Sequence, residues 1–408
     1  MLKSMEDQQR AVKAVQDGQT IFLTGPAGTG KTHVLKDVIR WAQRSKKKIG
    51  VTAMTGSAAL LLGGRTLHSF LGLGLGTGEP RALVDRARKK YAYALSRART
   101  VELLVIDEIS MADDAFLDNV SEFLKIVRCD MRPFGGTQIV FCGDLCQLPP
   151  VQGKYCFRAR AWAEANPRVI QLTKIFRQDS DGAFKDMLQR LRWGTCNDED
   201  YARLKSLCRP DVPSVPGILP TRLYSRHRDV DAVNLRELQK LPGARQGYPT
   251  RYAGDAARAW ANACGIPETI ALCPDCQVVL TCNLDQDGGL VNGARGRVLC
   301  VNQDTVSIEW FDGTHGTIEY RSTHPEDDDT LTVDYLPLKL AWAITIHKSQ
   351  GMTLTSVEID LGDSIFEYGQ AYTALSRART LDSIRLTGIS RKAFRSHPDV
   401  LEFYSGIV

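Results

Sequence analysis

The run from Gly25 to Thr32 constrains this chain more than any other feature, because it has the spacing of a phosphate-binding loop. Two glycines bracket four residues, and Lys31 and Thr32 follow directly. The apolar run 21–23 precedes the loop and a helical pattern follows it, which is the strand–loop–helix context that such a loop requires. Backbone amides and the helix start would surround a phosphate, Lys31 would reach the β- and γ-phosphates, and Thr32 would offer its hydroxyl to Mg²⁺. The sequence therefore predicts a nucleoside triphosphate site.

Length and composition exclude several classes of protein. The chain has 408 residues, of which 43% are hydrophobic, enough for two or three packed domains. It contains no run of 18 apolar residues, so no membrane span is expected, and residues 1–6 show no apolar signal core. Eleven cysteines without a signal peptide indicate a reducing compartment. We expect an intracellular protein, with nucleus, cytoplasm and mitochondrion left open.

The net charge of +5 is mild, but its distribution is uneven. Residues 81–100 carry seven basic side chains against the single acidic residue Asp85. A solvated helix can have this composition, and so can a segment that binds a nucleic-acid backbone. Composition alone does not decide between these two interpretations.

Short apolar runs alternate with helical stretches along most of the chain, a pattern typical of parallel strands buried on both faces. We expect strands at residues 21–23, 49–52, 103–106, 139–141, 169–172, 222–224 and 357–359. The predicted class is α/β, built from βαβ units.

Two stretches depart from this pattern. Residues 72–100 begin with a glycine-rich run and continue as a basic helix, which predicts a small insertion in the first domain. Residues 296–336 alternate apolar and polar positions and contain an Asp-Gly turn at 312–313, which predicts a small antiparallel barrel. The acidic run 326–329 is expected to be an exposed loop.

Two acids, Asp107 and Glu108, end the apolar strand at 103–106. At the carboxyl end of a buried parallel strand, Asp107 can hold Mg²⁺ and Glu108 can orient or deprotonate the attacking water. The alternative is a strand followed by two solvated acids. The phosphate loop upstream favours the catalytic interpretation.

Three further side chains are candidates for the triphosphate. Gln147 follows another strand end and can hydrogen-bond the γ-phosphate or the water, although a glutamine in a turn before Pro149 and Pro150 looks the same. Arg177 and Arg377 are candidates for neutralising transition-state charge, whereas a surface salt bridge is the commoner fate of an arginine.

Cysteine and histidine patterns give weaker signals. Cys273 and Cys276 form a CxxC motif without a second ligand pair at zinc-ribbon spacing, so ordinary buried thiols are favoured over a metal site. His68 and His347 lie among small polar residues that suit phosphate or base contacts, and helix capping explains them equally well. The heptapeptide Ala-Leu-Ser-Arg-Ala-Arg-Thr occurs at 94–100 and at 374–380 with unlike flanks, so we interpret the repeat as coincidence.

Taken in order, these segments resemble the DNA helicases of superfamily one, and among them the RecD-like Pif (petite integration frequency) family, over almost the whole chain. The most specific segments are Phe134-Gly135-Gly136 with Gly143-Asp144 and Gln147–Val151, and Thr345 to Gly351. The resemblance also takes in Thr52–Ala59, Gly64–Phe70, Phe176–Gln178, Leu290–Gly296 and Ala374–Arg377.

The resemblance implies roles for particular residues. The catalytic set would be Lys31, Asp107, Glu108, Gln147, Arg177 and Arg377, the last two as arginine fingers. ATP would be held by Gln8 at the adenine, by Gly25, Pro26, Ala27, Gly28, Thr29, Gly30, Lys31 and Thr32, and by Gly351. Mg²⁺ would be held by Thr32 and Asp107. DNA would be contacted by Thr55, Gly56, Arg65, His68, Ser69, Asn292, His347 and Lys348.

The resemblance also implies a fold and a mechanism. Two RecA-like phosphate-loop domains would cover 1–71 with 101–165, and 166–240 with 337–408. The basic insertion 72–100 would act as a wedge where the duplex splits, and an insertion at 241–336 would contain an SH3-like barrel at about 296–336. ATP would close the cleft between the domains, and its hydrolysis would drive the motor 5′ to 3′ on single-stranded DNA and into single–double-strand junctions.

Other functions remain possible at this stage. A translocase that displaces proteins with little unwinding, an RNA helicase of the same superfamily and an ATP-gated binding module share much of the pattern. The substrate is also open among duplex, G-quadruplex and RNA–DNA hybrid, as is the role in repair, recombination, replication or telomere maintenance. We expect a monomeric core, no membrane association and protein partners that the sequence does not identify.

Overall fold

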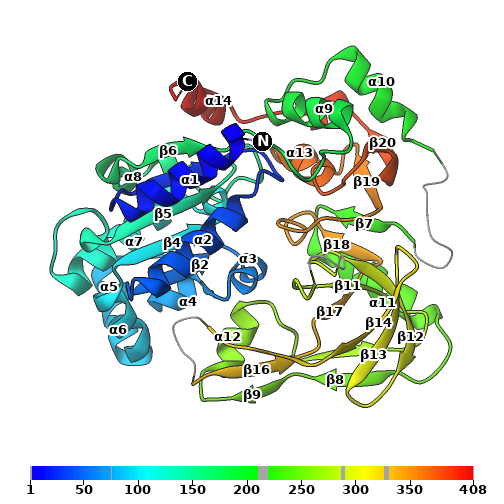
Figure 1. Cartoon of the computed structure of the whole chain (residues 1–408), viewed down its shortest axis with the longest axis horizontal. Coiled ribbons are helices and arrows are strands. Elements are labelled where there is room, and N and C mark those ends of the chain that lie inside the picture. The colour runs from blue at the N-terminus through cyan, green and yellow to red at the C-terminus, as the bar shows by residue number, and fades with distance from the viewer. Residues whose placement is uncertain (1, 75, 210–218, 286–289, 326–329, 408) are drawn as a thin grey trace.

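Two parallel sheets, one from each half of the chain, organise the structure, and an antiparallel β unit lies below the second (Figure 1). The structure, a computed structural model, describes residues 2–74, 76–209, 219–285, 290–325 and 330–407. The loop expected at 326–329 lies outside the described residues.

The first sheet has six strands in the order β3-β2-β4-β5-β1-β6, and every neighbouring pair is parallel. Its strands are β1 (Ile21–Thr24), β2 (Ile49–Ala53), β3 (Arg65–Thr66), β4 (Leu103–Asp107), β5 (Gln138–Gly143) and β6 (Arg168–Gln171). The five strands expected in this half of the chain are confirmed. Continuous apolar runs form them because successive side chains enter cores on opposite faces, as Leu103 and Leu104 do.

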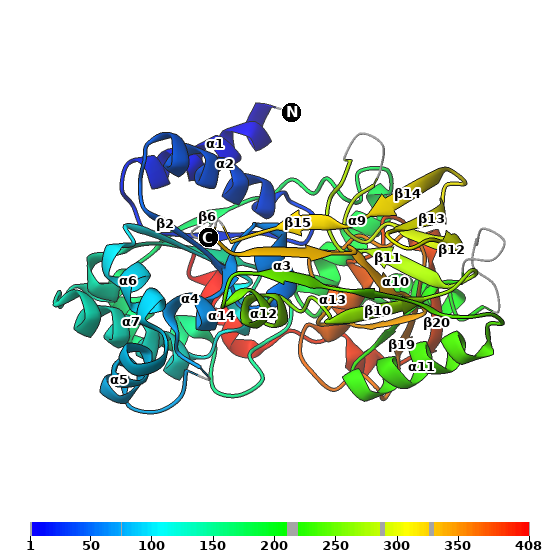
Figure 2. The same ribbon diagram turned by 90° about the horizontal axis from the view of Figure 1, so that it is seen from below.

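Helices cover both faces of the first sheet (Figure 2). One face packs on α1 (Leu2–Gln16) and α2 (Lys31–Arg44). The other face carries α4 (Leu67–Leu71), α5 (Pro80–Lys90), α6 (Ala92–Thr100), α7 (Asp114–Arg128) and α8 (Arg160–Ala165), and α3 (Gly56–Leu61) follows β2 at the sheet edge.

The basic segment expected as a helix forms the two helices α5 and α6. Leu83, Val84 and Ala87 of α5 are buried toward α7, whereas the basic side chains of α5 are exposed. Tyr93 of α6 is 85% exposed beside them. The hairpin therefore presents a basic and aromatic surface to solvent.

The second sheet has four parallel strands in the order β18-β7-β19-β20. They are β7 (Thr221–Tyr224), β18 (Ala343–Thr345), β19 (Val357–Leu361) and β20 (Ile384–Ile389), and they confirm the strands expected at 222–224 and 357–359. The helices of this half are α9 (Gly182–Arg192), α10 (Asp198–Ser206), α11 (His227–Lys240) and α13 (Gln370–Leu375).

The segment between α11 and β18 forms three antiparallel sheets. Their strands are β8 (Gln246–Pro249), β9 (Arg251–Ala253), β10 (Thr269–Leu272), β11 (Gln277–Leu280), β12 (Arg295–Val301), β13 (Thr305–Trp310), β14 (His315–Glu319), β15 (Arg321–Thr323), β16 (Thr332–Tyr335) and β17 (Leu338–Leu340), with α12 (Ala257–Ala263) between β9 and β10. The sheet orders are β14-β13-β12-β11-β17, β15-β16-β9 and β10-β8.

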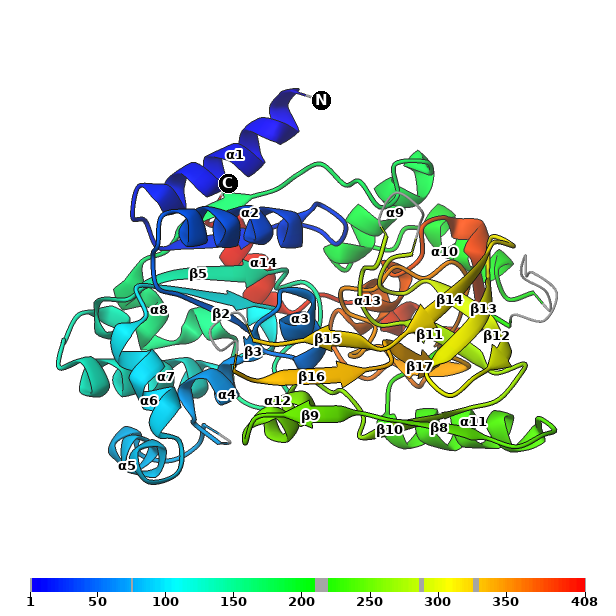
Figure 3. The ribbon, with the colours of Figure 1, turned by 60° about the horizontal axis from the view of Figure 1, so that its bottom comes forward.

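This arrangement differs from a single unit at 296–336. The strands expected there are present, but they belong to two sheets: β12, β13 and β14 continue a sheet that β12 joins to β11, whereas β15 pairs with β16 and β16 pairs with β9. Alternation of apolar and polar residues fixes which face of a strand is buried and does not say which strand lies beside it. Figure 3 shows the β15–β16 ribbon reaching from this unit toward α3.

The last helix, α14 (Pro398–Ser405), returns to the first sheet although it follows the last strand of the second (Figure 1). The Phe403 ring stacks on Phe157 with centroids 4.5 Å apart and meets Phe22 and Trp162 edge-on. The Tyr404 hydroxyl lies 2.6 Å from Thr24 Oγ1. The C-terminal helix therefore ties the second half of the chain to the first.

Replacing Phe403 with Ala should lower the free energy of unfolding by about 2–3 kcal/mol, somewhat less than for a fully buried phenylalanine. Leu401, exposed on the same helix, provides a matched control whose alanine variant should change stability by less than about 0.5 kcal/mol. Urea unfolding of the two variants makes the comparison. Equal effects would contradict the packing of α14 on the first sheet.

Candidate active site

The predicted phosphate loop connects β1 to α2 and turns at three glycines. Gly25, Gly28 and Gly30 have φ values of 148°, 80° and 85°, which side chains rarely tolerate. Gly30 is the residue before the first turn of α2, and it brings no side chain to the first amides of that helix. Those amides and the helix dipole are therefore available to an anion.

Lys31 stands at the mouth of the loop. Its Nζ donates to the carbonyl oxygens of Gly25 and Pro26 at 2.7 and 3.0 Å, and Thr29 Oγ1 donates to the Pro26 carbonyl at 2.9 Å. The ammonium group is thus held by loop carbonyls, which bind it less strongly than a phosphate oxygen would.

The loop packs closely against the segment that carries Arg177. A Cβ at Gly25 would lie 2.4 Å from the Leu172 carbonyl oxygen, and one at Gly28 would lie 2.6 Å from Arg177 Cβ. The Phe176 amide donates to the Gly28 carbonyl at 2.8 Å. The glycines therefore serve the close approach of this segment as well as the turn.

Asp107 and Glu108 lie where β4 ends. Asp107 Oδ1 accepts from the Glu108 amide at 2.9 Å, and Glu108 has a left-handed backbone with φ of 54°. Burial raises the pKa of both carboxyls, and the adjacent Asp107 helps to raise the pKa of Glu108 to about 7. A carboxyl with this pKa is suited to accept a proton near neutral pH.

A cavity of about 590 Å³ brings the predicted residues from both halves of the chain together. Its lining includes Gln8, Ala27, Gly28, Thr29, Gly30, Lys31, Thr32, Glu108, Gln147, Arg177, Gly351 and Arg377. Gly25, Pro26 and Asp107 are not among the residues that line it. Residues as far apart in the sequence as Gln8 and Arg377 thus share one site, as a triphosphate between two lobes requires.

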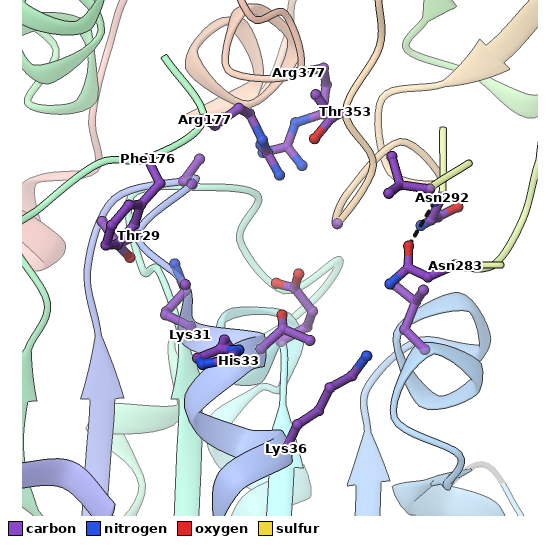
Figure 4. A pocket seen from close by; sticks show the side chains of 18 of the residues that line it. Thr29, Lys31, His33, Lys36, Phe176, Arg177, Asn283, Asn292, Thr353 and Arg377 are labelled. Atoms are coloured by element: carbon purple, nitrogen blue, oxygen red, sulfur yellow. Dashed lines mark hydrogen bonds between the residues drawn. The ribbon is translucent and has the colours of Figure 1, made fainter. Parts of the chain in front are cut away.

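Arg177 and Arg377 project into the cavity from the side opposite Lys31 (Figure 4). Arg177 donates to the Ser376 carbonyl at 3.0 Å, and Arg377 donates to the Thr373 carbonyl at 3.0 Å and to Ser376 Oγ at 2.7 Å. Burial lowers the pKa of both guanidiniums, and the charge of Arg377 lowers that of Arg177 further. An anion in the cavity would relieve this cost.

The structure adds residues that the sequence did not single out. Phe176, Lys36 and Asn283 line the same cavity, with Phe176 44% exposed and Lys174 Nζ 4.9 Å from its ring centre. An exposed aromatic directly before a predicted arginine finger was the available signal for Phe176. Lys36 and Asn283 belong to no motif, so only the fold brings them here.

The residues expected to contact DNA fall into two groups. In the first lobe, Thr55 caps α3 by accepting from the Ala58 amide at 3.3 Å, and His68 stacks on Phe116 with ring centres 4.4 Å apart. Burial lowers the pKa of His68. Arg65 is only 4% exposed, and the Ser69 amide donates to Thr66 Oγ1.

The second group comes from the other half of the chain. Lys348 is exposed, His347 is half-buried, and Asn292 is 7% exposed and lines the nucleotide cavity (Figure 4). Asn292 therefore lies nearer to the triphosphate site than expected of a DNA contact.

Helix α12 covers part of the first group. Trp260 Nε1 donates to the Gly64 carbonyl at 3.3 Å, and a Cβ at Gly56 would lie 2.3 Å from the Ala263 carbonyl oxygen. In this conformation Gly56 faces α12 and Arg65 is enclosed. A strand of DNA would reach them only if α12 moved.

The CxxC motif and the heptapeptide repeat have structural explanations. Cys273 and Cys276 are buried with their Sγ atoms 3.4 Å apart, and the described residues contain no group of three or more His, Cys, Asp or Glu that could hold a metal. In the first copy of the repeat, Arg97 donates to the Phe70 carbonyl at 3.0 Å and so caps α4. The second copy places Arg377 in the cavity.

Over the described part of the chain, helices are too short or too polar to cross a bilayer.

Comparisons with known proteins agree on one family. A family model described as PIF1-like helicase matches residues 3–202. ATP-dependent DNA helicase PIF1 of Xenopus laevis is 38% identical over 98% of this chain and 63% of its own length, and the human protein is 37% identical over 98% and 63%. The chain thus spans under two thirds of these relatives.

Solved structures give the same result. The crystal structure of Pif1 helicase from Candida albicans is 36% identical, covers 98% of this chain and 99% of its own, and has a TM-score of 0.80. Bacteroides Pif1 in complex with ADP-AlF4 is 29% identical with a TM-score of 0.83, and the match covers 98% of this chain and 96% of the Bacteroides chain. Bacteroides Pif1 bound to single-stranded DNA is 29% identical with a TM-score of 0.70, again covering 98% and 96%.

The pKa of Glu108 generates a test of the site. The pKa of Glu108 in the folded protein is about 7, above its ordinary value of 4.5. Below pH 4.5 the carboxyl is protonated in both states and does not lower the free energy of unfolding, whereas above pH 7 ionisation of the buried group lowers it by the full amount. Glu108→Gln should therefore stabilise the protein at pH 8 relative to its effect at pH 5, by up to about 3 kcal/mol.

Thermal or urea unfolding of wild type and variant at the two pH values measures this difference. A stability difference that is the same at pH 5 and pH 8 would mean that Glu108 is an ordinary solvated acid.

Proposed function

The chain belongs to the PIF1-like helicase family, and on that premise we propose that it is an ATP-dependent DNA helicase that moves 5′ to 3′ along single-stranded DNA. The observation that carries the proposal is the cavity in which Lys31 faces Arg177 and, from the other half of the chain, Arg377. A site divided between two lobes lets nucleotide binding and hydrolysis close and reopen them.

Each side chain has a task in this mechanism. Lys31 and the first amides of α2 bind the β- and γ-phosphates, and Gln8 lies beside Gly30 at the adenine end. Glu108 accepts the proton of the attacking water, which Gln147 helps to orient. Arg177 and Arg377 neutralise the charge that develops on the γ-phosphate, an effect worth about 10³–10⁵ in rate in related phosphoryl transfers.

Mg²⁺ fits the donors present. The Thr32 hydroxyl and the Asp107 carboxylate are oxygen ligands of the kind this cation prefers, and a cation would lower the cost of ionising the buried Asp107. When bound there, Mg²⁺ supplies positive charge to the β- and γ-phosphate oxygens.

The lobes and the insertions have separate roles in the proposal. The boundary expected at residue 165 is wrong, because β6 (Arg168–Gln171) pairs with β1 in the first sheet. The two ATPase lobes are therefore residues 1–71 with 101–171 and residues 172–240 with 337–408, with α14 packed back on the first. The α5–α6 hairpin, with its exposed basic residues and Tyr93, is the wedge at the junction. The β unit at 241–336, with the expected SH3-like barrel at about 296–336, encloses the strand, and α12 moves away from Gly56 and Arg65 when DNA enters.

Unwinding of two matched partial duplexes tests polarity and activity together. The duplex with a 5′ single-stranded tail should open when ATP is added, the duplex with a 3′ tail should not, and Lys31→Ala should abolish both opening and ATP turnover. Single-strand-stimulated ATP hydrolysis without opening of either duplex would replace the helicase with a translocase that unwinds little.

The arginine assignment has an internal control in the repeated heptapeptide. Arg377→Ala should lower kcat for ATP about 10³-fold or more, because it removes a charge that acts only in the transition state. Arg97 occupies the same position in the first copy of the heptapeptide, but it caps α4 and does not enter the cavity. In Arg97→Ala, basal ATP hydrolysis should therefore stay within about threefold of wild type. Similar losses in both variants would contradict the role of Arg377.

A further inference from the structure

Tyr372 lies at the point where α13 meets the first lobe, and its side chain is 3% exposed. The Ala27 amide of the phosphate loop donates to Tyr372 Oη at 3.0 Å, and the hydroxyl donates to Asp144 Oδ2 at 3.2 Å. One hydroxyl from the second half of the chain therefore bonds two separate loops of the first.

We propose that Tyr372 is a positioning residue that makes the phosphate loop, the turn carrying Gln147 and the helix leading to Arg377 a single mechanical unit. The inference rests on the proposed function. It names the side chain that couples nucleotide binding in the phosphate loop to the position of Arg377.

The first link is an ionised acceptor. Asp144 is fully buried, and Arg192 binds it with Nε at 3.1 and 3.2 Å and Nη2 at 2.9 Å. This arginine lowers the pKa of Asp144, while burial holds the pKa of Tyr372 well above its usual value. Tyr372 therefore stays protonated, and its O–H donates a hydrogen bond to the Asp144 carboxylate. Such a bond to a charged acceptor is stronger than one between neutral groups.

The second link is the turn after β5. Asp144 Oδ1 accepts from the Cys146 amide at 3.2 Å, and the Asp144 carbonyl accepts from the Gln147 amide at 3.0 Å. A Cβ at Gly369, where α13 begins, would lie 2.3 Å from the Cys146 carbonyl oxygen and 2.4 Å from that of Gln147. The start of α13 thus rests directly on the turn that presents Gln147.

The third link runs from α13 to Arg377. Arg377 Nε donates to the Thr373 carbonyl at 3.0 Å, within the same helix as Tyr372. Gln178 Nε2 donates to the Ala378 carbonyl at 2.7 Å, which holds the end of α13 beside Arg177. Because the segment of Arg177 is itself held on the phosphate loop, a shift of α13 at Tyr372 would move Arg377 relative to both Arg177 and Lys31.

A buried tyrosine can also serve stability alone, and Tyr404 provides the matched case. Its hydroxyl joins the same polar region through Thr24 Oγ1 at 2.6 Å and accepts from the Leu145 amide of the turn after β5 at 3.4 Å, and the Arg192 guanidinium lies 5.0 Å from its ring centre. Tyr404 belongs to α14 and bonds neither the Ala27 amide nor α13. Replacing either tyrosine with Phe removes one buried hydroxyl that touches the turn after β5, but only Tyr372→Phe breaks the bond between α13 and the Ala27 amide of the phosphate loop.

Two measurements test the proposal. Tyr372→Phe should lower kcat for ATP about 10-fold with little change in KM, as expected for loss of one charge-assisted hydrogen bond in the transition state. Tyr404→Phe, with a similar loss of thermal stability, should stay within about twofold. In an Arg377→Ala background, Tyr372→Phe should have less than about a twofold further effect, because both act through the same arginine.

Hydrogen–deuterium exchange decides the loop link without relying on hydrolysis. Peptides containing Ala27 should exchange faster in Tyr372→Phe than in wild type or Tyr404→Phe. Equal exchange in all three proteins, or a Tyr372→Phe effect on kcat that is the same with and without Arg377, would overturn the proposal. A wild-type protein that fails to hydrolyse ATP, with the exchange difference present, would overturn the proposed function and leave the link standing.

Discussion

A buried ion pair between Asp144 and Arg192 holds the parts of the active site together. Both side chains are at most 1% exposed, so each would carry a large desolvation cost without the other. Asp144 directly follows β5 of the first sheet, whereas Arg192 is the last residue of α9, which precedes the second sheet in the chain. Tyr372 of α13 donates to Asp144, and the ring of Tyr404 of α14 lies beside Arg192, so both helices pack around the pair. The polar contacts that join the two lobes are therefore concentrated beside the phosphate loop.

This arrangement explains why like charges gather at the cavity. Lys31 bonds only loop carbonyls there, and Arg177 and Arg377 face each other from the other lobe. With Lys36, four lysine and arginine side chains of the described residues line the cavity, and their mutual repulsion opposes closure of the lobes. A bound triphosphate with four negative charges offsets this repulsion and favours closure. When the γ-phosphate leaves after hydrolysis, the repulsion returns. Electrostatics of this kind favour a cleft that closes on ATP and reopens on release.

Much of this site was predictable from the sequence because its motifs are short and local. The phosphate loop needs only glycines at fixed spacing before a helix, and Asp107 and Glu108 need only a buried strand before them. Seven strands of the two parallel sheets followed from apolar runs, whereas β3, β18 and β20 were not singled out as strands in the sequence. Other features depend on long-range packing: the partners of β15 and β16, the return of α14 to the first sheet, and the placement of Lys36 and Asn283. The repeat at 94–100 shows the limit clearly, since identical residues cap a helix in one place and line the cavity in the other.

The most direct test of the account is the affinity for ADP with aluminium fluoride, a transition-state mimic, compared with that for ADP alone. If the cavity is completed by Arg377 from the second half of the chain, Arg377→Ala should weaken binding of the mimic by about 100-fold or more and leave ADP binding within a few-fold of wild type. An equal loss for both ligands, or a loss for neither, would contradict a site completed in the transition state by the second lobe.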